Sequence, residues 1–128
     1  MEIREYLIDS DVLIDYLRGV KKAYNFLLKE NFKGKLWISV INVMEIYSGK
    51  DTKSPKKEKI INEFLNSFKI IPINKEIAIK TGKIRRDYQK PFADAIIAAS
   101  ALAYNLFLVT RNKKHFAKIE NLKVISPY

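Results

Sequence analysis

The sequence predicts an α/β protein, a three-layer α/β/α sandwich around a central, mostly parallel sheet of about five strands. Short apolar runs rich in β-branched residues alternate along the chain with longer segments whose apolar residues recur at helical spacing. No hairpin turn signal joins two of the short runs, so neighbouring strands are expected to be parallel and connected through helices. At 128 residues the chain is long enough for one core, and residues 1–128 are expected to form a single domain.

The expected elements follow one another in regular alternation. Strands are expected at residues 6–8, 35–40, 69–73, 106–110 and, at the edge of the sheet, 123–126. Helices are expected at residues 12–17, 21–30, 43–47, 60–68, 77–88 and 91–104, where the apolar residues have helical spacing. Asn42 is a suitable N-cap for the third of these helices, and Pro91 suits the start of the last one. The polar, lysine-rich residues 50–59 are expected to form an exposed loop.

The composition limits the chemistry that the chain can perform. It contains no cysteine, which excludes thiolate catalysis, cysteine-bound zinc and disulfides, and which agrees with a cytoplasmic protein. Its only histidine is His115, so a Ser-His-Asp triad and a multi-histidine metal site are both rejected. A Gly-rich phosphate loop is absent as well. Oxygen ligands are therefore what the chain can offer a metal ion.

The net charge of +10 and the pI near 9.7 favour a polyanionic partner, because basic side chains that contact phosphates release condensed counterions. A lysine-rich surface also occurs in proteins that bind no nucleic acid, so the charge alone does not decide. No apolar run approaches the roughly 20 residues of a membrane span, and the N-terminal sequence has no secretory signal pattern. The chain is expected to be soluble and cytoplasmic, without a membrane partner.

Acidic residues follow the expected strands of this basic protein. Asp9 and Asp11 come directly after residues 6–8, and Glu45 lies just past residues 35–40. In an open α/β sheet, ligands bind in the crevice at the carboxyl ends of the strands, so these carboxylates are candidate metal ligands. The competing interpretation is helix capping, with Asp9 or Asp11 as an N-cap and Glu45 reaching back to the backbone N–H of Asn42 in a capping box.

Asp94 is the only charged residue in residues 91–104, a helix that is apolar nearly all round. It is therefore expected to be buried. A buried carboxylate normally takes up a proton, pairs with a cation or binds a metal ion. The interaction of a first-turn Asp with the helix dipole contributes only about 0.3 to 1 kcal/mol, which is too little to explain a buried charge. Asp94 is thus a third candidate ligand.

With Asp9, Glu45 and Asp94 in this order, the sequence resembles the PIN-domain ribonucleases, in particular the toxins of VapBC-type toxin-antitoxin pairs. The matching motifs are residues 7–19, 38–45, 92–99, and 108–112 with Phe116. The resemblance implies a PIN-like fold and a divalent-metal-dependent endoribonuclease that cleaves RNA phosphodiester bonds. It also implies a small antitoxin protein as partner and a homodimer of the toxin itself.

The same resemblance implies that Asp9, Glu45 and Asp94 are the catalytic residues and hold the metal ion, Mg²⁺ or Mn²⁺. Both ions prefer carboxylate and water oxygens. The family often has a fourth acidic position in the last motif, and many relatives have an acid where this chain has His115. Two residues are candidates to complete the site: Asn112, through its amide oxygen or a water, and Asp11.

Two other functions are compatible with these residues. A catalytically silent RNA- or partner-binding module would use the acids only as helix caps and would bind no divalent ion. The segment from Asp9 to Leu13 is also similar to the DxD motif of the haloacid dehalogenase phosphatases, in which the first Asp is a nucleophile. The usual Gly-Thr after that motif is missing here, and a trapped phospho-aspartate would distinguish the phosphatase reaction.

Overall fold

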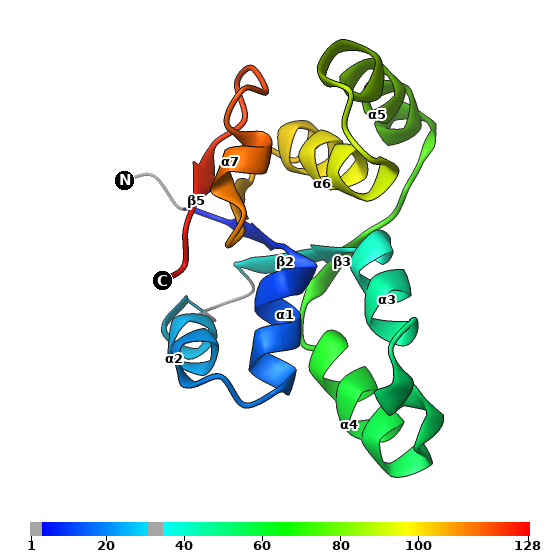
Figure 1. The fold of residues 1–128 in the computed structure, drawn as a ribbon, viewed down its shortest axis with the longest axis vertical. Coiled ribbons are helices and arrows are strands. Elements are labelled where there is room, and N and C mark those ends of the chain that lie inside the picture. The colour runs from blue at the N-terminus through cyan, green and yellow to red at the C-terminus, as the bar shows by residue number, and fades with distance from the viewer. Residues whose placement is uncertain (1–3, 31–34) are drawn as a thin grey trace.

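The computed structural model describes residues 4–30 and 35–128, and its elements follow the expected alternation (Figure 1). The strands are β1 Tyr6–Ile8, β2 Leu36–Ser39, β3 Lys69–Ile71, β4 Phe107–Val109 and β5 Val124–Ile125. The helices are α1 Ser10–Leu17, α2 Lys21–Glu30, α3 Val40–Tyr47, α4 Pro55–Leu65, α5 Lys75–Tyr88, α6 Phe92–Ala103 and α7 Lys113–Phe116, with a 3₁₀ helix, η1, at Lys50–Lys53. Within the described ranges, none of these helices has the length and apolar content that a membrane span requires.

The strands of the described chain form one sheet in the order β3-β2-β1-β4-β5, and every neighbouring pair is parallel. Leu7 in β1 lies beside Trp37 of β2 on one side and Leu108 of β4 on the other. The chain builds the sheet outward from β1 to β3 and then returns to the other side of β1 with β4. The strand order therefore reverses between β1 and β4. In α/β sheets, ligands bind at the carboxyl ends of the strands beside such a switch point.

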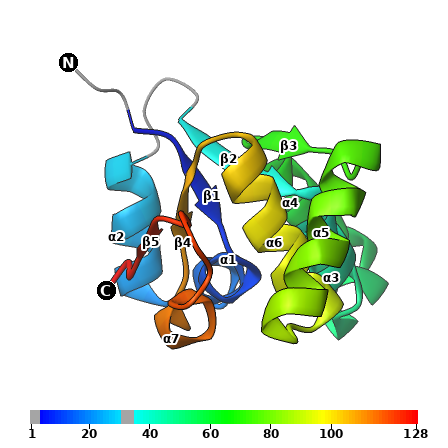
Figure 2. The same cartoon turned by 90° about the horizontal axis from the view of Figure 1, so that it is seen from above.

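Helices cover both faces of the sheet, which confirms the predicted three layers (Figures 1 and 2). Successive side chains of a strand point to opposite faces. Leu7 and Leu108 accordingly pack with residues of α5, α6 and α7, whereas Tyr6, Ile8 and Val109 pack with residues of α1, α2 and α4. The central strands are thus buried on both faces, so a ligand can meet this sheet only at the ends of its strands.

The third helix begins earlier than the sequence predicts. α3 starts at Val40, and its N-cap is Ser39 rather than Asn42. The Ser39 hydroxyl accepts the backbone N–H of Ile41 (3.2 Å), and Asn42 Oδ1 accepts the backbone N–H of Ser39 (2.7 Å). The prediction was wrong because Ser and Asn are both good N-caps, and the apolar residues between them continue the strand pattern. Asn42 therefore takes the place in the capping box that was expected for Glu45.

Residues 50–59 are not the plain loop that was expected. They contain η1 and the first turn of α4, which has Ser54 as its N-cap and Pro55 at its start. The Ser54 hydroxyl accepts the backbone N–H of Lys57 (3.4 Å). Pro is favoured in the first turn of a helix, and the Lys and Glu residues that follow are good helix formers, so the polar composition concealed a helix.

Candidate active site

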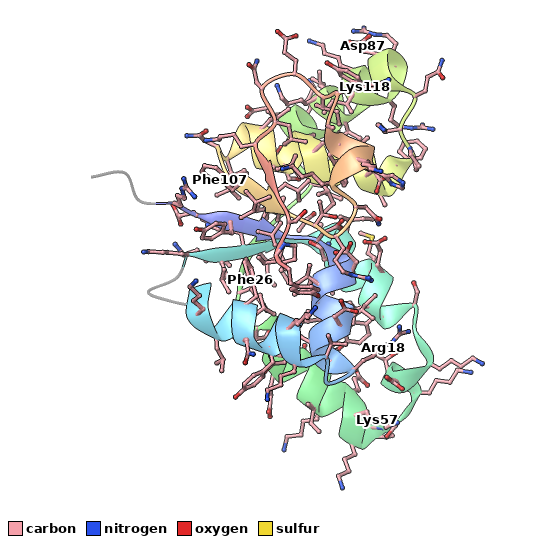
Figure 3. All side chains as sticks on the ribbon, turned by 60° about the vertical axis from the view of Figure 1, so that its left-hand side comes forward. Arg18, Phe26, Lys57, Asp87, Phe107 and Lys118 are labelled. Atoms are coloured by element: carbon pink, nitrogen blue, oxygen red, sulfur yellow. The ribbon has the colours of Figure 1, made fainter. Side chains whose placement is uncertain are left out.

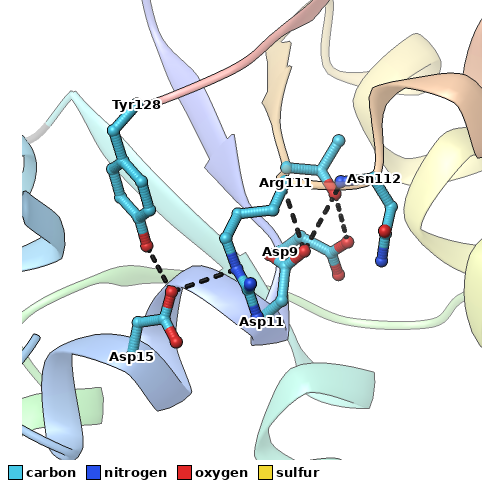
Figure 4. Close-up of polar contacts among 7 residues, drawn as sticks. Asp9, Asp11, Asp15, Arg111, Asn112 and Tyr128 are labelled. Atoms are coloured by element: carbon cyan, nitrogen blue, oxygen red, sulfur yellow. Dashed lines mark hydrogen bonds and ion pairs between the residues drawn. The ribbon is translucent and has the colours of Figure 1, made fainter.

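The ends of β1 and β4 bring Thr110 into contact with Asp9 (Figure 4) at the switch point. The backbone N–H of Asp9 donates to the carbonyl of Val109 (2.9 Å), so the two strands stay paired as far as Asp9. Thr110 follows directly, and its hydroxyl donates to Asp9 Oδ2 (2.9 Å). The first predicted ligand therefore lies where a doubly wound sheet binds its ligands.

Thr110 also connects Asp9 to a second carboxylate. Its hydroxyl lies 3.3 Å from Asp11 Oδ2, and the same oxygen accepts the backbone N–H of Arg111 (3.0 Å). Asp9 Oδ1 accepts the backbone N–H of Ser10 (2.8 Å), which makes Asp9 the N-cap of α1. Asp9 thus caps the helix with one oxygen and faces Thr110 with the other. Capping and metal binding are compatible roles for this residue.

Burial raises the pKa of Asp9 to about 7, and the negative charge of Asp11 acts in the same direction. The charge of Glu45 adds a smaller effect of the same sign, while the hydrogen bonds from Thr110 and Ser10 lower the pKa. Burial also raises the pKa of Asp11, against the hydrogen bonds that this carboxylate accepts. Two neighbouring carboxylates therefore resist ionisation unless a cation compensates their charge.

The surroundings of Asp11 fit such a cation. Its Oδ1 atom is buried and accepts no hydrogen bond from any residue that the structure describes. A buried carboxylate oxygen without a partner is costly, and a divalent cation would satisfy it. In residues 4–30 and 35–128, no three His, Cys, Asp or Glu side chains are arranged to hold one ion. Mg²⁺ is commonly bound through one or two carboxylates together with waters and substrate phosphates, so the Asp9–Asp11 pair suits it.

Glu45 reaches the same end of the sheet through a side-chain contact. The Ser10 hydroxyl donates to Glu45 Oε1 at 2.7 Å, although the rest of the Glu45 side chain is exposed. Its charge contributes to the raised pKa of Asp9. The capping interpretation of Glu45 was wrong, because Ser39 and Asn42 form the capping box of α3. Its carboxylate is left for another role.

Asp94 makes a separate contact. It lies in the first turn of α6 with its side chain 29% exposed, and its Oδ2 is 3.8 Å from His115 Nδ1. The expectation of a buried Asp94 was wrong, since full burial of α6 begins only at Ala95 and Phe92 is 62% exposed. An apolar pattern does not distinguish a buried turn from one at the rim of the core. No hydrogen bond or ion pair among the described residues joins Asp94 to the other candidate ligands, and its role as a ligand stays a prediction.

Asn112 contributes its backbone to the cluster. Its N–H donates to Thr110 Oγ1 (3.0 Å), which leaves the threonine hydrogen for the carboxylates. The Asn112 side chain is exposed and makes no capping hydrogen bond at the start of α7. Its amide oxygen is available in the described structure, and its role as a ligand also stays a prediction.

Arg111, Asp15 and Tyr128 form a polar group beside the acids (Figure 4). Arg111 Nε lies 3.0 Å from Asp15 Oδ2, and the Tyr128 hydroxyl donates to the same oxygen at 2.5 Å. Burial and the contact with Asp15 raise the pKa of Tyr128, so the phenol is the donor. The Asp15 side chain is 13% exposed and that of Arg111 is 50% exposed. Asp15 and Arg111 lie in the sequence motifs at residues 7–19 and 108–112, but nothing in the sequence connects them with each other or with Tyr128.

A groove of about 300 Å³ lies between α1, α3, η1 and α4, and Glu45 forms part of its wall. Its lining includes the apolar residues Ile14, Leu17 and Ile61 and the charged residues Arg18, Glu45 and Lys50. The groove therefore offers apolar surface and charges of both signs next to the candidate site.

The fold and the site define an α/β protein that gathers carboxylates at the switch point of a parallel sheet. Residues 6–122 match the family model described as PIN domain, and the chain belongs to the PIN-domain family. It is 36% identical over 122 residues to ribonuclease VapC10 of Mycobacterium tuberculosis, which covers 91% of this chain and 90% of that protein. It is 34% identical over 124 residues to ribonuclease VapC1 of Methanocaldococcus jannaschii, which covers 93% of this chain and 84% of that protein.

A solved structure extends the similarity to three dimensions. The chain resembles a toxin-antitoxin complex from Klebsiella pneumoniae with a TM-score of 0.83 and 35% sequence identity, over 97% of this chain and 98% of that chain. The family resemblance inferred from the four sequence motifs is thereby confirmed.

Proposed function

We propose that the protein is an endoribonuclease, the toxin of a type II toxin-antitoxin pair, and that it hydrolyses RNA phosphodiester bonds with Mg²⁺ or Mn²⁺. The observation that carries the proposal is the Asp9–Asp11 pair at the switch point, in which a buried carboxylate oxygen has no donor. The names of the relatives support ribonuclease activity, and the net charge of +10 supports a polyanionic substrate.

Asp9 and Asp11 would hold the metal ion, joined by Glu45, Asp94 and the amide oxygen of Asn112. When bound, a divalent ion supplies Lewis acidity, lowers the pKa of a bound water and neutralises charge on the phosphate. The threonine hydroxyl shared by the first two carboxylates keeps them side by side, and their burial limits competition from bulk water.

Purified protein is expected to cleave single-stranded RNA in the presence of Mg²⁺ or Mn²⁺ and to stop when EDTA is in excess. Cleavage is followed on gels, and calorimetry measures Mn²⁺ binding to the same sample. Equal cleavage in EDTA would contradict the metal-dependent mechanism. A protein that neither binds Mn²⁺ nor cleaves RNA would support the silent binding module, and a trapped phospho-aspartate would support the phosphatase.

The positively charged guanidinium of Arg111 lies beside the acids. Asp15 holds its Nε, while the half-exposed side chain leaves the terminal NH₂ groups free to donate to an RNA phosphate. We expect Arg111→Ala to raise the KM for RNA roughly tenfold, because a hydrogen bond to a charged group contributes about 1.5 kcal/mol. The slope of log affinity against log salt concentration should become shallower by about one phosphate contact.

The matched control for this prediction is Arg86→Ala. Arg86 is also exposed and forms an ion pair with Asp87. Asp87 projects outward on α5, at the opposite end of the molecule from Lys57 of α4 (Figure 3). The control should leave KM and the salt slope close to those of the wild type. Equal losses in both variants would mean that net charge, rather than the position of Arg111, governs RNA binding.

We further propose that an antitoxin lays a peptide segment along the groove between α1, α3, η1 and α4. Apolar side chains of the segment would pack on Ile14 and Leu17, and an arginine of the segment would pair with Glu45. Occupation of the groove would then block a candidate metal ligand directly. The similarity to the toxin-antitoxin complex supports a partner of this kind. We also propose that the toxin forms a homodimer, as the family resemblance implies.

A further inference from the structure

We infer that Ser10 and Asn42 position the carboxylate of Glu45 for the metal ion, through a relay of hydrogen bonds that starts at the end of β2. The inference rests on the proposed function, because it takes Glu45 as a metal ligand. The relay joins two consecutive elements, β2, which ends at Ser39, and α3, which carries Glu45, to Ser10 at the start of α1, 35 positions before Glu45.

The relay has a fixed direction. The backbone N–H of Ser39 can only donate, so the Asn42 atom 2.7 Å from it is the carbonyl oxygen Oδ1. The amide Nδ2 then faces Ser10 Oγ at 2.8 Å and donates to it. Because Ser10 Oγ accepts this bond, its own hydrogen is directed to Glu45 Oε1, 2.7 Å away. Each group therefore determines the orientation of the next.

The relay is shielded from water up to its last member. Ser39 and Asn42 are fully buried and Ser10 is 6% exposed, whereas Glu45 is exposed. The inner groups cannot exchange their partners for water without opening the fold, and hydrogen bonds in such a site are strong. Only Oε1 of Glu45 is held in this way. The second oxygen, Oε2, has no hydrogen bond in the described structure and is available to a cation.

The relay also sets the place of Glu45 relative to Asp9. Ser10 follows Asp9 directly, and its backbone N–H binds the Asp9 carboxylate while its hydroxyl binds that of Glu45. Ser10 thus contacts both carboxylates and sets the distance between the two candidate ligands, Asp9 and Glu45. A flexible glutamate that is held in advance loses less conformational freedom when a metal ion binds. Groups that orient metal ligands in this way typically change metal affinity by roughly 10- to 100-fold.

The test is a double-mutant cycle on Mn²⁺ affinity, measured by calorimetry for the wild type, Ser10→Ala, Glu45→Ala and the double variant. We expect Ser10→Ala to weaken Mn²⁺ binding at least roughly tenfold, and to have no further effect once Glu45 is alanine. Equal weakening in both backgrounds would overturn the inference, because Ser10 would then act on the fold or on other ligands. Unchanged Mn²⁺ affinity in Ser10→Ala would overturn it too.

The control is Ser100→Ala. Ser100 is fully buried as well, but its hydroxyl donates to the carbonyl of Ile96 within its own helix (2.7 Å). This variant should change thermal stability without changing Mn²⁺ affinity, which separates a positioning effect from a structural one. If both serine variants weaken Mn²⁺ binding equally, the relay is not the cause.

Asn42→Ser is measured in parallel, so that the result does not depend on one variant folding. Its shorter side chain cannot span the distance from Ser39 to Ser10, and the same weakening of Mn²⁺ binding is expected. Unchanged affinity in this variant would overturn the inference. A wild-type protein that binds no Mn²⁺ would overturn the proposed function, whereas Mn²⁺ binding that is indifferent to Ser10 and Asn42 overturns only the relay.

Discussion

Asp9→Asn is expected to abolish RNA cleavage and to make the metal-free protein more stable than the wild type at neutral pH. Loss of a ligand should lower cleavage by more than the roughly 100-fold that the loss of an orienting group causes. The change keeps the capping oxygen that binds the Ser10 N–H, and the new amide can donate to the Thr110 hydroxyl, so the local structure should persist.

The stability effect follows from the pKa of Asp9, which the fold raises from its ordinary 3.8 to about 7. Between these values the folded protein binds more protons than the unfolded chain, so stability falls as the pH rises through this range. Each tenfold change in proton affinity is worth about 1.4 kcal/mol, and the full loss is on the order of 2 to 4 kcal/mol. Above about pH 7 the loss is complete.

Urea denaturation in EDTA, between about pH 4.5 and pH 8.5, measures this dependence. The wild type should lose stability across the range, and Asp9→Asn should lose less. Asp87→Asn is the control, since the contact with Arg86 lowers the pKa of this exposed carboxyl and places its titration below the range. A wild-type protein whose metal-free stability rises with pH would contradict the prediction. With Mn²⁺ present the wild-type trend should reverse, because the ion binds the deprotonated carboxylates.

Asp94→Asn is also expected to reduce RNA cleavage by more than roughly 100-fold and to reduce the stabilisation of the protein by Mn²⁺. The substitution keeps the shape of the side chain but removes its charge. A strongly buried, unpaired Asp94 would predict a more stable variant in EDTA. Asp94 is partly exposed and contacts His115, so the substitution should change the free energy of unfolding in EDTA by no more than about 1 kcal/mol.

Thermal melts with and without Mn²⁺, alongside the RNA assay, test this prediction. His115→Ala is the matched control, because it removes the contact partner of Asp94 while leaving the carboxylate. The control should retain most of the cleavage activity. A fully active Asp94→Asn variant would remove Asp94 from the site. Equal inactivation by His115→Ala would show that the pair, rather than a metal ligand, is required.

The sequence alone determined the architecture, because periodicity depends on which residues must face the core. Short β-branched runs and amphipathic segments alternate without hairpins, and only a parallel sheet with helices on both faces buries both patterns. Local capping was less certain, since Ser39 and Asn42 are equally good caps for α3. Packing decided between them, by burying both residues in one capping box.

The candidate ligands at strand ends were also evident from sequence, because a strand end can be recognised from its own residues. Asp9 and Asp11 follow β1 directly, which predicts their place at the carboxyl ends of the strands. That this place is the switch point depends on the strand order, which only the tertiary structure shows. The depth of Asp94 was misjudged. Whether an apolar helix turn is covered depends on what packs over it, which the helix sequence does not contain.

Only the tertiary structure decided which partners these carboxylates have. Thr110 binds Asp9 across 101 positions of chain, and Ser10 binds Glu45 across 35. Asp15 meets Arg111 and Tyr128 in the same way. Hydrogen bonds are short-ranged and directional, so their partners depend on strand order and register rather than on local pattern. The sequence therefore determined that carboxylates follow the carboxyl ends of the strands, and the tertiary structure determined which hydroxyl, amide and guanidinium groups hold them there.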